Sequence, residues 1–160
     1  MKIIILNGKI GSGKSFVGSK LHQTLKNSAY IEGDAFLQIN PFNPTTQNYH
    51  LVAKNIAKQV KIYQKFKNIE YVIISWVIWD KKTFDILSQS LNIFNIYPIL
   101  LVCPQEILEK RLKEDVENNK RFCDNLEKTN RPIYTDGFEK IMVDKSSQAI
   151  VDDIIKIINN

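Results

Sequence analysis

Apolar and polar residues follow two different periods along this chain, one typical of buried strands and one typical of helices. Short apolar runs predict strands at residues 2–6, 29–31, 71–78, 99–102 and 141–143. Between these runs, apolar residues recur at helical spacing. The predicted helices cover residues 14–26, a long stretch from Thr45 or Thr46 to about 67, and stretches after Asp80, after Pro104 and after Ser146 or Ser147. Strands that alternate with helices predict a parallel sheet covered on both faces, in one three-layer α/β domain over residues 1–160.

The composition is that of an ordinary globular protein, with 44% hydrophobic and 24% charged residues, so we expect a single core. No apolar run approaches the roughly 18 residues of a membrane span. No signal or transit segment is visible before the first predicted strand, so we expect a cytoplasmic protein without membrane contact. Cys103 and Cys123 lie in no metal-binding motif, and we expect them to be free thiols.

The net charge of +5 is mild and favours anionic ligands without indicating nucleic acid. Four lysines at helical spacing form one basic stripe on the long helix, namely Lys54, Lys58, Lys61 and Lys65. The stripe is compatible with contacts to a nucleic-acid backbone, but it has few interleaved aromatic residues. We therefore favour its interpretation as the solvent face of an amphipathic helix.

The first helix is preceded by a phosphate-binding motif. Residues 8–15 match G-x-x-x-x-G-K-[ST], the Walker A motif or P-loop, and they follow an apolar strand and open a helix, as the motif requires. The residues predicted to bind a nucleoside triphosphate are Gly8, Lys9, Ile10, Gly11, Ser12, Gly13, Lys14, Ser15 and Phe16. Lys14 would neutralise the β- and γ-phosphates of ATP, and the Ser15 hydroxyl would hold Mg²⁺.

A carboxylate follows the second predicted strand. In parallel α/β sheets, ligands bind at the carboxyl ends of the strands, so Asp34 is expected to lie across the pocket from Lys14. We expect Asp34 to bind an acceptor hydroxyl and take its proton. A helix N-cap is the other role open to it. The acceptor pocket is expected between residues 36–49, Phe36 included, and Trp76 and Trp79. For the two tryptophans, core packing is an equal alternative.

A polar stretch at residues 118–137 has no clear periodicity and contains Lys120, Arg121 and Arg131. A basic segment in this position is expected to close over the phosphates as a lid. Arg121 is the predicted catalytic arginine, with Arg131 as another candidate, and Arg111 on the preceding helix is expected to contact the nucleotide. For each arginine, a solvated surface charge is the alternative.

Taken together, these segments resemble the small P-loop kinases of the nucleoside and nucleotide kinase group. The resemblance rests on residues 8–15, on Gly33 and Asp34, on residues 108–112 and on residues 143–146. Gluconate and shikimate kinases, adenylylsulfate kinase and chloramphenicol phosphotransferase belong to this group. The resemblance implies a sheet order of 2-3-1-4-5, Mg²⁺ bound with ATP, and contact between Asp34 and the acceptor.

Two departures from the group's patterns bear on the acceptor. The His-Pro pair that gluconate kinases carry soon after the acid is missing, and no arginine lies between Gly8 and Lys110. Adenylate-type kinases clamp an acceptor phosphate with arginines, so their acceptors are disfavoured.

The sequence therefore predicts an ATP-dependent kinase that phosphorylates a hydroxyl of a small molecule, as a monomer or a homodimer. Two alternatives stay open. One is a nucleotide or nucleic-acid-end kinase, and the other is a nucleotide-switched binding protein.

Overall fold

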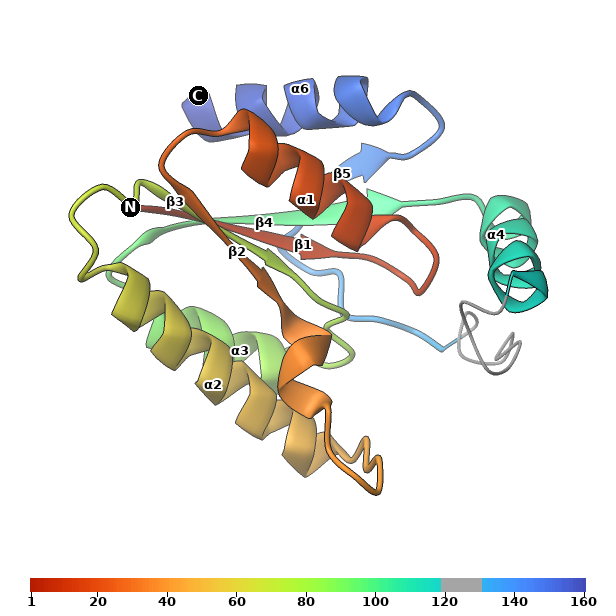
Figure 1. Ribbon diagram of the computed structural model, residues 1–160, viewed down its shortest axis with the longest axis horizontal. Coiled ribbons are helices and arrows are strands. Elements are labelled where there is room, and N and C mark those ends of the chain that lie inside the picture. The colour runs from red at the N-terminus through yellow and green to blue at the C-terminus, as the bar shows by residue number, and fades with distance from the viewer. Residues whose placement is uncertain (119–130) are drawn as a thin grey trace.

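Five parallel strands form the centre of the molecule, which a computed structural model describes over residues 1–118 and 131–160 (Figure 1). The strands are β1 (Lys2–Asn7), β2 (Ser28–Glu32), β3 (Tyr71–Ser75), β4 (Asn95–Val102) and β5 (Glu139–Met142). They lie in the order β2-β3-β1-β4-β5, and every neighbouring pair is parallel. The predicted fold class and strand order are confirmed.

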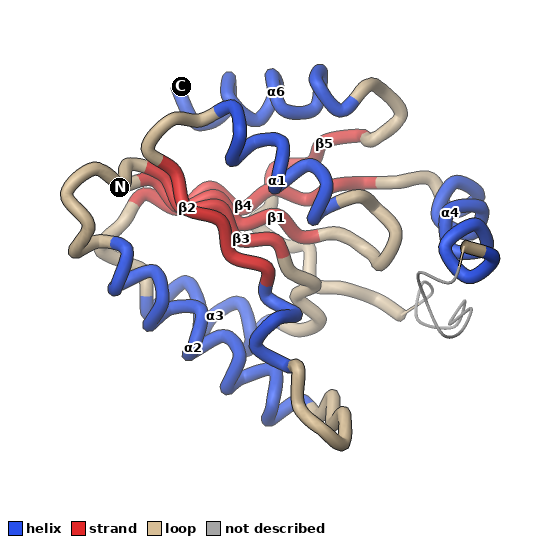
Figure 2. Tube along the Cα trace, viewed as in Figure 1, coloured by secondary structure: helices blue, strands red, loops and turns tan. Residues whose placement is uncertain are grey.

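Helices cover both faces of the sheet. They are α1 (Lys14–Thr24), α2 (Thr46–Tyr63), α3 (Lys81–Ser90), α4 (Gln105–Glu117) and α6 (Ser147–Asn159). In Figures 1 and 2, α1 and α6 lie on one face of the sheet, α2 and α3 lie on the other, and α4 lies beyond the strand ends. This is the three-layer arrangement that the alternating sequence pattern predicts.

The central strand β1 explains why both faces need cover. Ile3 and Ile5 belong to the core beneath α2 and α3, whereas Ile4 and Leu6 belong to the core beneath α1 and α6. Successive side chains of a strand point to opposite faces, so a continuous apolar run supplies both cores.

Side-chain caps begin three of the helices where the sequence predicts them. Thr45 caps α2, Asp80 caps α3 and Ser146 caps α6, each by accepting a hydrogen bond from a backbone N–H in the first turn. Asp80 also accepts a hydrogen bond from the Thr83 hydroxyl at 2.8 Å. The cap fixes where the chain turns back after β3.

Three predicted boundaries are wrong by three residues or more. The strand expected over residues 99–102 begins earlier, at Asn95. The strand expected over residues 71–78 ends at Ser75, because the strands on either side of β3 end at Asn7 and Glu32 and leave the later residues without a ladder partner. The long helix ends at Tyr63 instead of near residue 67. Within the described ranges, no helix combines the length and apolar character that a membrane span needs.

Candidate active site

The P-loop joins the end of β1 to the start of α1. A side chain at Gly8 would meet the backbone carbonyl oxygen of Leu101 at 2.8 Å, so only glycine lets the loop leave β1 so close to β4. Gly13 has a φ of +91°, a conformation that side chains disfavour, and it turns the chain directly into α1. The sequence therefore forms a tight loop that ends on a helix N-terminus.

The start of α1 offers donors for an anion. No side chain caps this helix and its first turn has no acidic residue, so no carboxylate competes for the first N–H groups. Lys14 is buried, at 8% exposed, and its Nζ donates a hydrogen bond to the carbonyl oxygen of Lys9 at 3.0 Å. The ammonium group is thus held inside the concave side of the loop. The loop and its lysine fit a polyphosphate.

A cavity of about 770 Å³ opens in front of the P-loop. Its lining includes Ile10, Gly11, Ser12, Gly13, Lys14, Ser15, Phe16 and Arg111, all of which the sequence predicts as nucleotide-binding residues. Gly8 and Lys9 belong to the same loop but do not line the cavity. The volume lies in the range of small-molecule and cofactor sites. The Ser12 Oγ is buried and has no hydrogen-bond partner in the described part of the chain.

Arg111 holds α4 against the P-loop. Its guanidinium donates a hydrogen bond to the carbonyl oxygen of Gly11 at 3.2 Å and lies 3.8 Å from the Sγ of Cys103. Burial raises the pKa of the Cys103 thiol, and the nearby Arg111 charge opposes that rise. The arginine therefore stands where its charge can reach both the loop and a nucleotide in the cavity.

A tyrosine positions a second carboxylate at the cavity wall. The Tyr30 hydroxyl donates a hydrogen bond to the Glu32 carboxylate at 2.5 Å and lies 3.5 Å from the carbonyl oxygen of Ser15. Burial, and then the bond to Glu32, raises the pKa of Tyr30, so the phenol stays protonated and keeps donating. Glu32 lines the cavity on the same side as Ser15, whose hydroxyl is the predicted Mg²⁺ ligand. The sequence analysis missed Glu32.

Asp34 lies at the junction of two cavities. It belongs to the short 3₁₀ helix Gly33–Leu37, is exposed, and lines both the P-loop cavity and a second cavity of about 430 Å³. Among the described residues, only Ile10 and Val77 also line both cavities. Glu32, not Asp34, is the N-cap residue, and none of the described residues donates a hydrogen bond to the Asp34 carboxylate. The N-cap alternative is thereby excluded, and the carboxylate is available to a ligand in either cavity.

The second cavity is mostly apolar. It is lined by Ile10, Asp34, Leu37, Gln38, Ile39, Phe42, Pro44, Tyr49, Val77, Trp79 and Arg131. Arg131 places its guanidinium carbon 4.5 Å from the centre of the Trp79 ring, in a cation–π contact. Burial raises the pKa of Tyr49 in the wall, although the Arg131 charge opposes the rise. Arg131 thus belongs to this second cavity and does not line the P-loop cavity.

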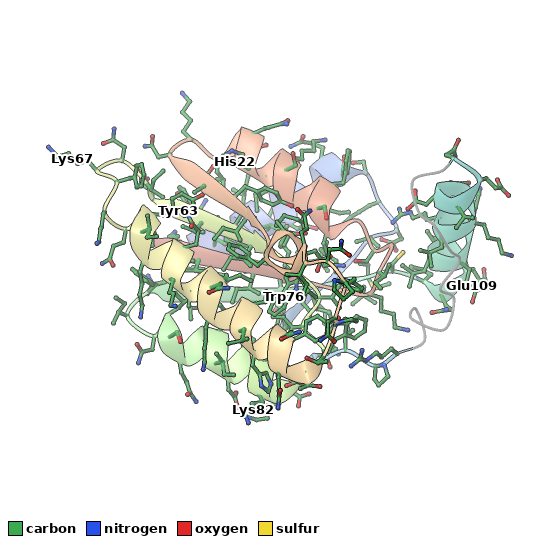
Figure 3. All side chains as sticks on the ribbon, turned by 60° about the horizontal axis from the view of Figure 1, so that its bottom comes forward. His22, Tyr63, Lys67, Trp76, Lys82 and Glu109 are labelled. Atoms are coloured by element: carbon green, nitrogen blue, oxygen red, sulfur yellow. The ribbon has the colours of Figure 1, made fainter. Side chains whose placement is uncertain are left out.

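Two predicted pocket residues lie elsewhere, and a third predicted residue falls outside the described part of the chain. Trp76 is 1% exposed and belongs to the core, which corrects its predicted place in the acceptor pocket; Figure 3 shows it near the middle of the molecule. Its ring covers Gly33, where a side chain would come within 2.3 Å of it. Phe36 packs half-buried against the same core, and Leu37 lines the cavity in its place. Arg121, with residues 119–130 of the predicted lid, lies outside the described residues.

Asn7, just before the P-loop, is hydrogen-bonded to segments that lie far from it in the sequence. Its Oδ1 accepts hydrogen bonds from the N–H groups of Gly8 and Ile78, at 2.8 and 3.0 Å. Its Nδ2 donates to the carbonyl oxygens of Tyr134 and Ile78, at 2.7 and 3.4 Å. The side chain is fully buried, so these bonds replace water for all its polar atoms. The sequence analysis gave Asn7 no role, because a lone Asn has no motif.

Part of the wall of the P-loop cavity comes from the last segment of the chain. Val143 and Lys145 line it from the turn between β5 and α6, and Ser147 and Ile150 line it from the start of α6. The resemblance to kinases includes this turn, but nothing in the sequence assigned its residues to the nucleotide.

All four lysines of the stripe are exposed; Lys54, Lys58 and Lys61 lie on α2, and Lys65 follows the end of the helix. Because α2 and α1 cover opposite faces of the sheet, the stripe is separated from the P-loop helix (Figure 1). The solvent-face interpretation fits this placement. Contact with nucleic acid stays untested.

The sheet order, the P-loop and its cavity define a P-loop protein with the fold of the small P-loop kinases. Residues 4–131 match the model of a family described as AAA domain, and the chain belongs to that family. No curated protein matches the chain significantly in sequence.

Solved structures with this fold include several kinases. A gluconokinase from Sinorhizobium meliloti 1021 is 18% identical, with a TM-score of 0.74 over 97% of this chain and 90% of its own. The Mycobacterium tuberculosis APS kinase, in complex with AMPPNP and APS, is 14% identical, with a TM-score of 0.78 over 99% and 98%. The Deinococcus radiodurans tunicamycin resistance protein is 18% identical, with a TM-score of 0.67 over 98% and 95%. At these identities the likeness establishes the fold.

Proposed function

We propose that the protein is an ATP-dependent kinase that transfers the γ-phosphoryl group to a hydroxyl of a small-molecule acceptor. One observation carries the proposal: a carboxylate, Asp34, stands where the P-loop cavity meets a second, mostly apolar cavity. A donor and an acceptor bound in the two cavities would bring their reacting ends together at this carboxylate. The kinases among the similar structures support the same class of reaction.

In this proposal the residues of the chain promote the reaction mainly by positioning the reactants and neutralising their charge. The P-loop N–H groups and Lys14 bind the β- and γ-phosphates, and Arg111 adds a second cation beside Gly11. The Ser15 hydroxyl, with Glu32 near it, would hold Mg²⁺, which when bound neutralises the charge on the phosphates. Exclusion of water by the loop and α4 would strengthen each of these interactions.

Asp34 acts on the acceptor. It binds the acceptor hydroxyl and takes its proton as the hydroxyl oxygen bonds to the γ-phosphorus. In the same step the bond from that phosphorus to the β,γ-bridging oxygen breaks, and its electron pair leaves with ADP. The lid over residues 118–137, the catalytic role of Arg121 and a cytoplasmic location stay predictions of the sequence.

Lys14→Ala tests the donor half of the proposal, with Lys26→Ala, an exposed lysine outside both cavities, as the matched control. We expect the Lys14 variant to lose about a hundredfold or more in phosphoryl transfer to a panel of hydroxyl compounds. The control variant is expected to transfer at the wild-type rate. Full activity of Lys14→Ala would remove the assignment of the P-loop as the donor site.

A further inference from the structure

The second cavity has a chemical character that narrows the acceptor. We propose that the acceptor is a hydroxylated compound with a flat aromatic ring and an anionic group, and that polyhydroxylated sugars and sugar acids are poor ligands. This inference rests on the proposed function for the identity of the site as the acceptor site. It goes beyond that function in naming what the site selects.

The wall of the cavity favours a ring. Seven apolar or aromatic side chains line it, and they come from the P-loop, from residues 37–49 and from the segment after β3. These side chains are Ile10, Leu37, Ile39, Phe42, Pro44, Val77 and Trp79. An apolar ligand that packs against this surface lowers the free energy by removing apolar area from water. An aromatic side chain such as Trp79 packs best against a flat ring. A cavity of about 430 Å³ holds a single substituted ring with room to spare.

The same wall offers few polar groups for a sugar. Each hydroxyl of a polyol loses its water on binding and needs a hydrogen-bond partner in exchange. The side chains that can supply one here are Asp34, Gln38, Tyr49 and Arg131. Asp34 is committed to the reacting hydroxyl, and Tyr49 is buried at 9% exposed. An open-chain sugar acid would leave several hydroxyls without partners.

Arg131 supplies the site for an anion. It is the one basic side chain among the described residues that line the cavity, and none of the described carboxylates lies within ion-pair distance of it. Its stacking on Trp79 holds the plane of the guanidinium beside the aromatic wall. A ring that packs in this cavity can therefore present a carboxylate to the guanidinium, which binds such groups through paired N–H donors.

Four probes separate ring from polyol and anion from neutral molecule. They are para-hydroxymethylbenzoate, benzyl alcohol, gluconate and sorbitol, each titrated by calorimetry into the protein with AMPPNP and Mg²⁺ present. We expect para-hydroxymethylbenzoate to bind about tenfold or more tightly than benzyl alcohol, and both to bind more tightly than gluconate and sorbitol. Gluconate binding as tightly as the aromatic acid would overturn the proposal, and so would the failure of both aromatic probes to bind.

Two variants test whether residues of the second cavity cause the preference for an aromatic anion. Arg131→Gln should reduce the affinity for para-hydroxymethylbenzoate to that for benzyl alcohol, whereas Lys82→Gln, at an exposed lysine of α3, should leave it unchanged. The aromatic probes should also change the tryptophan fluorescence of the wild type. In Trp79→Phe the remaining tryptophan, buried Trp76, should not respond. An unchanged affinity ratio in Arg131→Gln would overturn the role of the anion.

The outcomes also separate this inference from the proposed function. Transfer of the γ-phosphoryl group from ATP to gluconate but not to aromatic alcohols would keep the kinase and overturn the acceptor class. Binding of the aromatic acid that depends on Arg131, without phosphoryl transfer to any hydroxyl compound, would keep the ligand preference and remove the kinase.

Discussion

Asn7 donates a hydrogen bond from its side-chain amide to the backbone carbonyl oxygen of Tyr134 at 2.7 Å. The bond links the residue before the P-loop to the segment that carries Arg131. The same side chain also accepts hydrogen bonds from the backbone N–H groups of Gly8 and Ile78. It therefore connects the start of the P-loop, the segment after β3 and the segment before β5. One buried side chain therefore fixes the position of the P-loop relative to the segments that follow β3 and precede β5.

Asn7→Asp tests these hydrogen bonds with almost no change in the shape of the side chain. A carboxylate keeps the acceptors but loses the amide donors, and it brings a charge into a fully buried position. We expect the free energy of unfolding to fall by about 3 kcal/mol in chemical denaturation. Asn55→Asp, at an exposed position of α2, is the control and should change it by less than about 0.5 kcal/mol. Equally small changes in the free energy of unfolding for both variants would show that the hydrogen bonds of Asn7 do not stabilise the fold.

Gly33 lets Trp76 close the core beneath Asp34. A methyl group at this position would come within 2.3 Å of the Trp76 ring, so Gly33→Ala should lower stability by about 2 to 3 kcal/mol through overpacking. Gly137→Ala is the contrast, because nothing lies within 4 Å of its added methyl and only its φ of +77° is unfavourable. Its cost should be about 1 kcal/mol. Thermal unfolding compares the two, and a larger loss for Gly137→Ala would contradict the packing of Trp76.

Arg111 should matter for nucleotide affinity and its neighbour should not. Arg111→Gln removes the cation that contacts Gly11, and we expect the dissociation constant of AMPPNP with Mg²⁺ to rise about tenfold. Lys110→Gln makes a similar change at an exposed residue of the same helix that does not line the P-loop cavity. Titration calorimetry measures both. Similar affinities for the two variants would exclude Arg111 from the nucleotide site.

The Asp80 cap gives a pH-dependent contribution to stability. Burial raises the pKa of Asp80, but hydrogen bonds from Thr83 and the nearby His50 outweigh it, and the pKa in the folded protein is lowered. A lowered pKa means that the ionised carboxylate stabilises the fold above its unfolded pKa of about 3.9, and that this stabilisation is lost as the pH falls through the folded pKa.

Asp80→Ala should therefore cost about 1 kcal/mol of stability near neutral pH and less near pH 3. Denaturant unfolding at several pH values measures the difference from the wild type. Asp144→Ala, at an exposed residue that caps no helix, should show no such trend. A cost for Asp80→Ala that does not change with pH would argue against a charged cap.

The fold and the P-loop could be predicted from the sequence because their signals are local. The apolar runs and helical spacing give the alternating elements, and the P-loop motif gives a loop whose glycines are needed for close approach and for a positive φ. The caps Thr45, Asp80 and Ser146 are likewise local. Each of these features is decided by residues close together in the chain.

The second cavity, which we propose as the acceptor site, could not be predicted in the same way. Trp76 and Trp79 both follow β3, and only the three-dimensional structure distinguishes the one that covers Gly33 from the one that meets Arg131. The partners of Asn7, at Ile78 and Tyr134, lie far from it in the sequence. Contacts between distant segments leave no periodic pattern in the sequence. The sequence could therefore predict that Asp34 lies near the P-loop, but not which residues line the second cavity.

In the proposed reaction, Asp34 takes the proton of an acceptor hydroxyl during phosphoryl transfer. Phosphorus NMR can follow ATP and Mg²⁺ with para-hydroxymethylbenzoate and gluconate present, in the wild type, in Asp34→Asn and in Asp136→Asn, an exposed control outside both cavities. We predict a phosphate monoester signal for the wild type and the control. Asp34→Asn should bind AMPPNP normally yet form the monoester about a hundredfold or more slowly. Monoester formation at the wild-type rate in Asp34→Asn, or inorganic phosphate as the sole product of the wild type, would contradict the account.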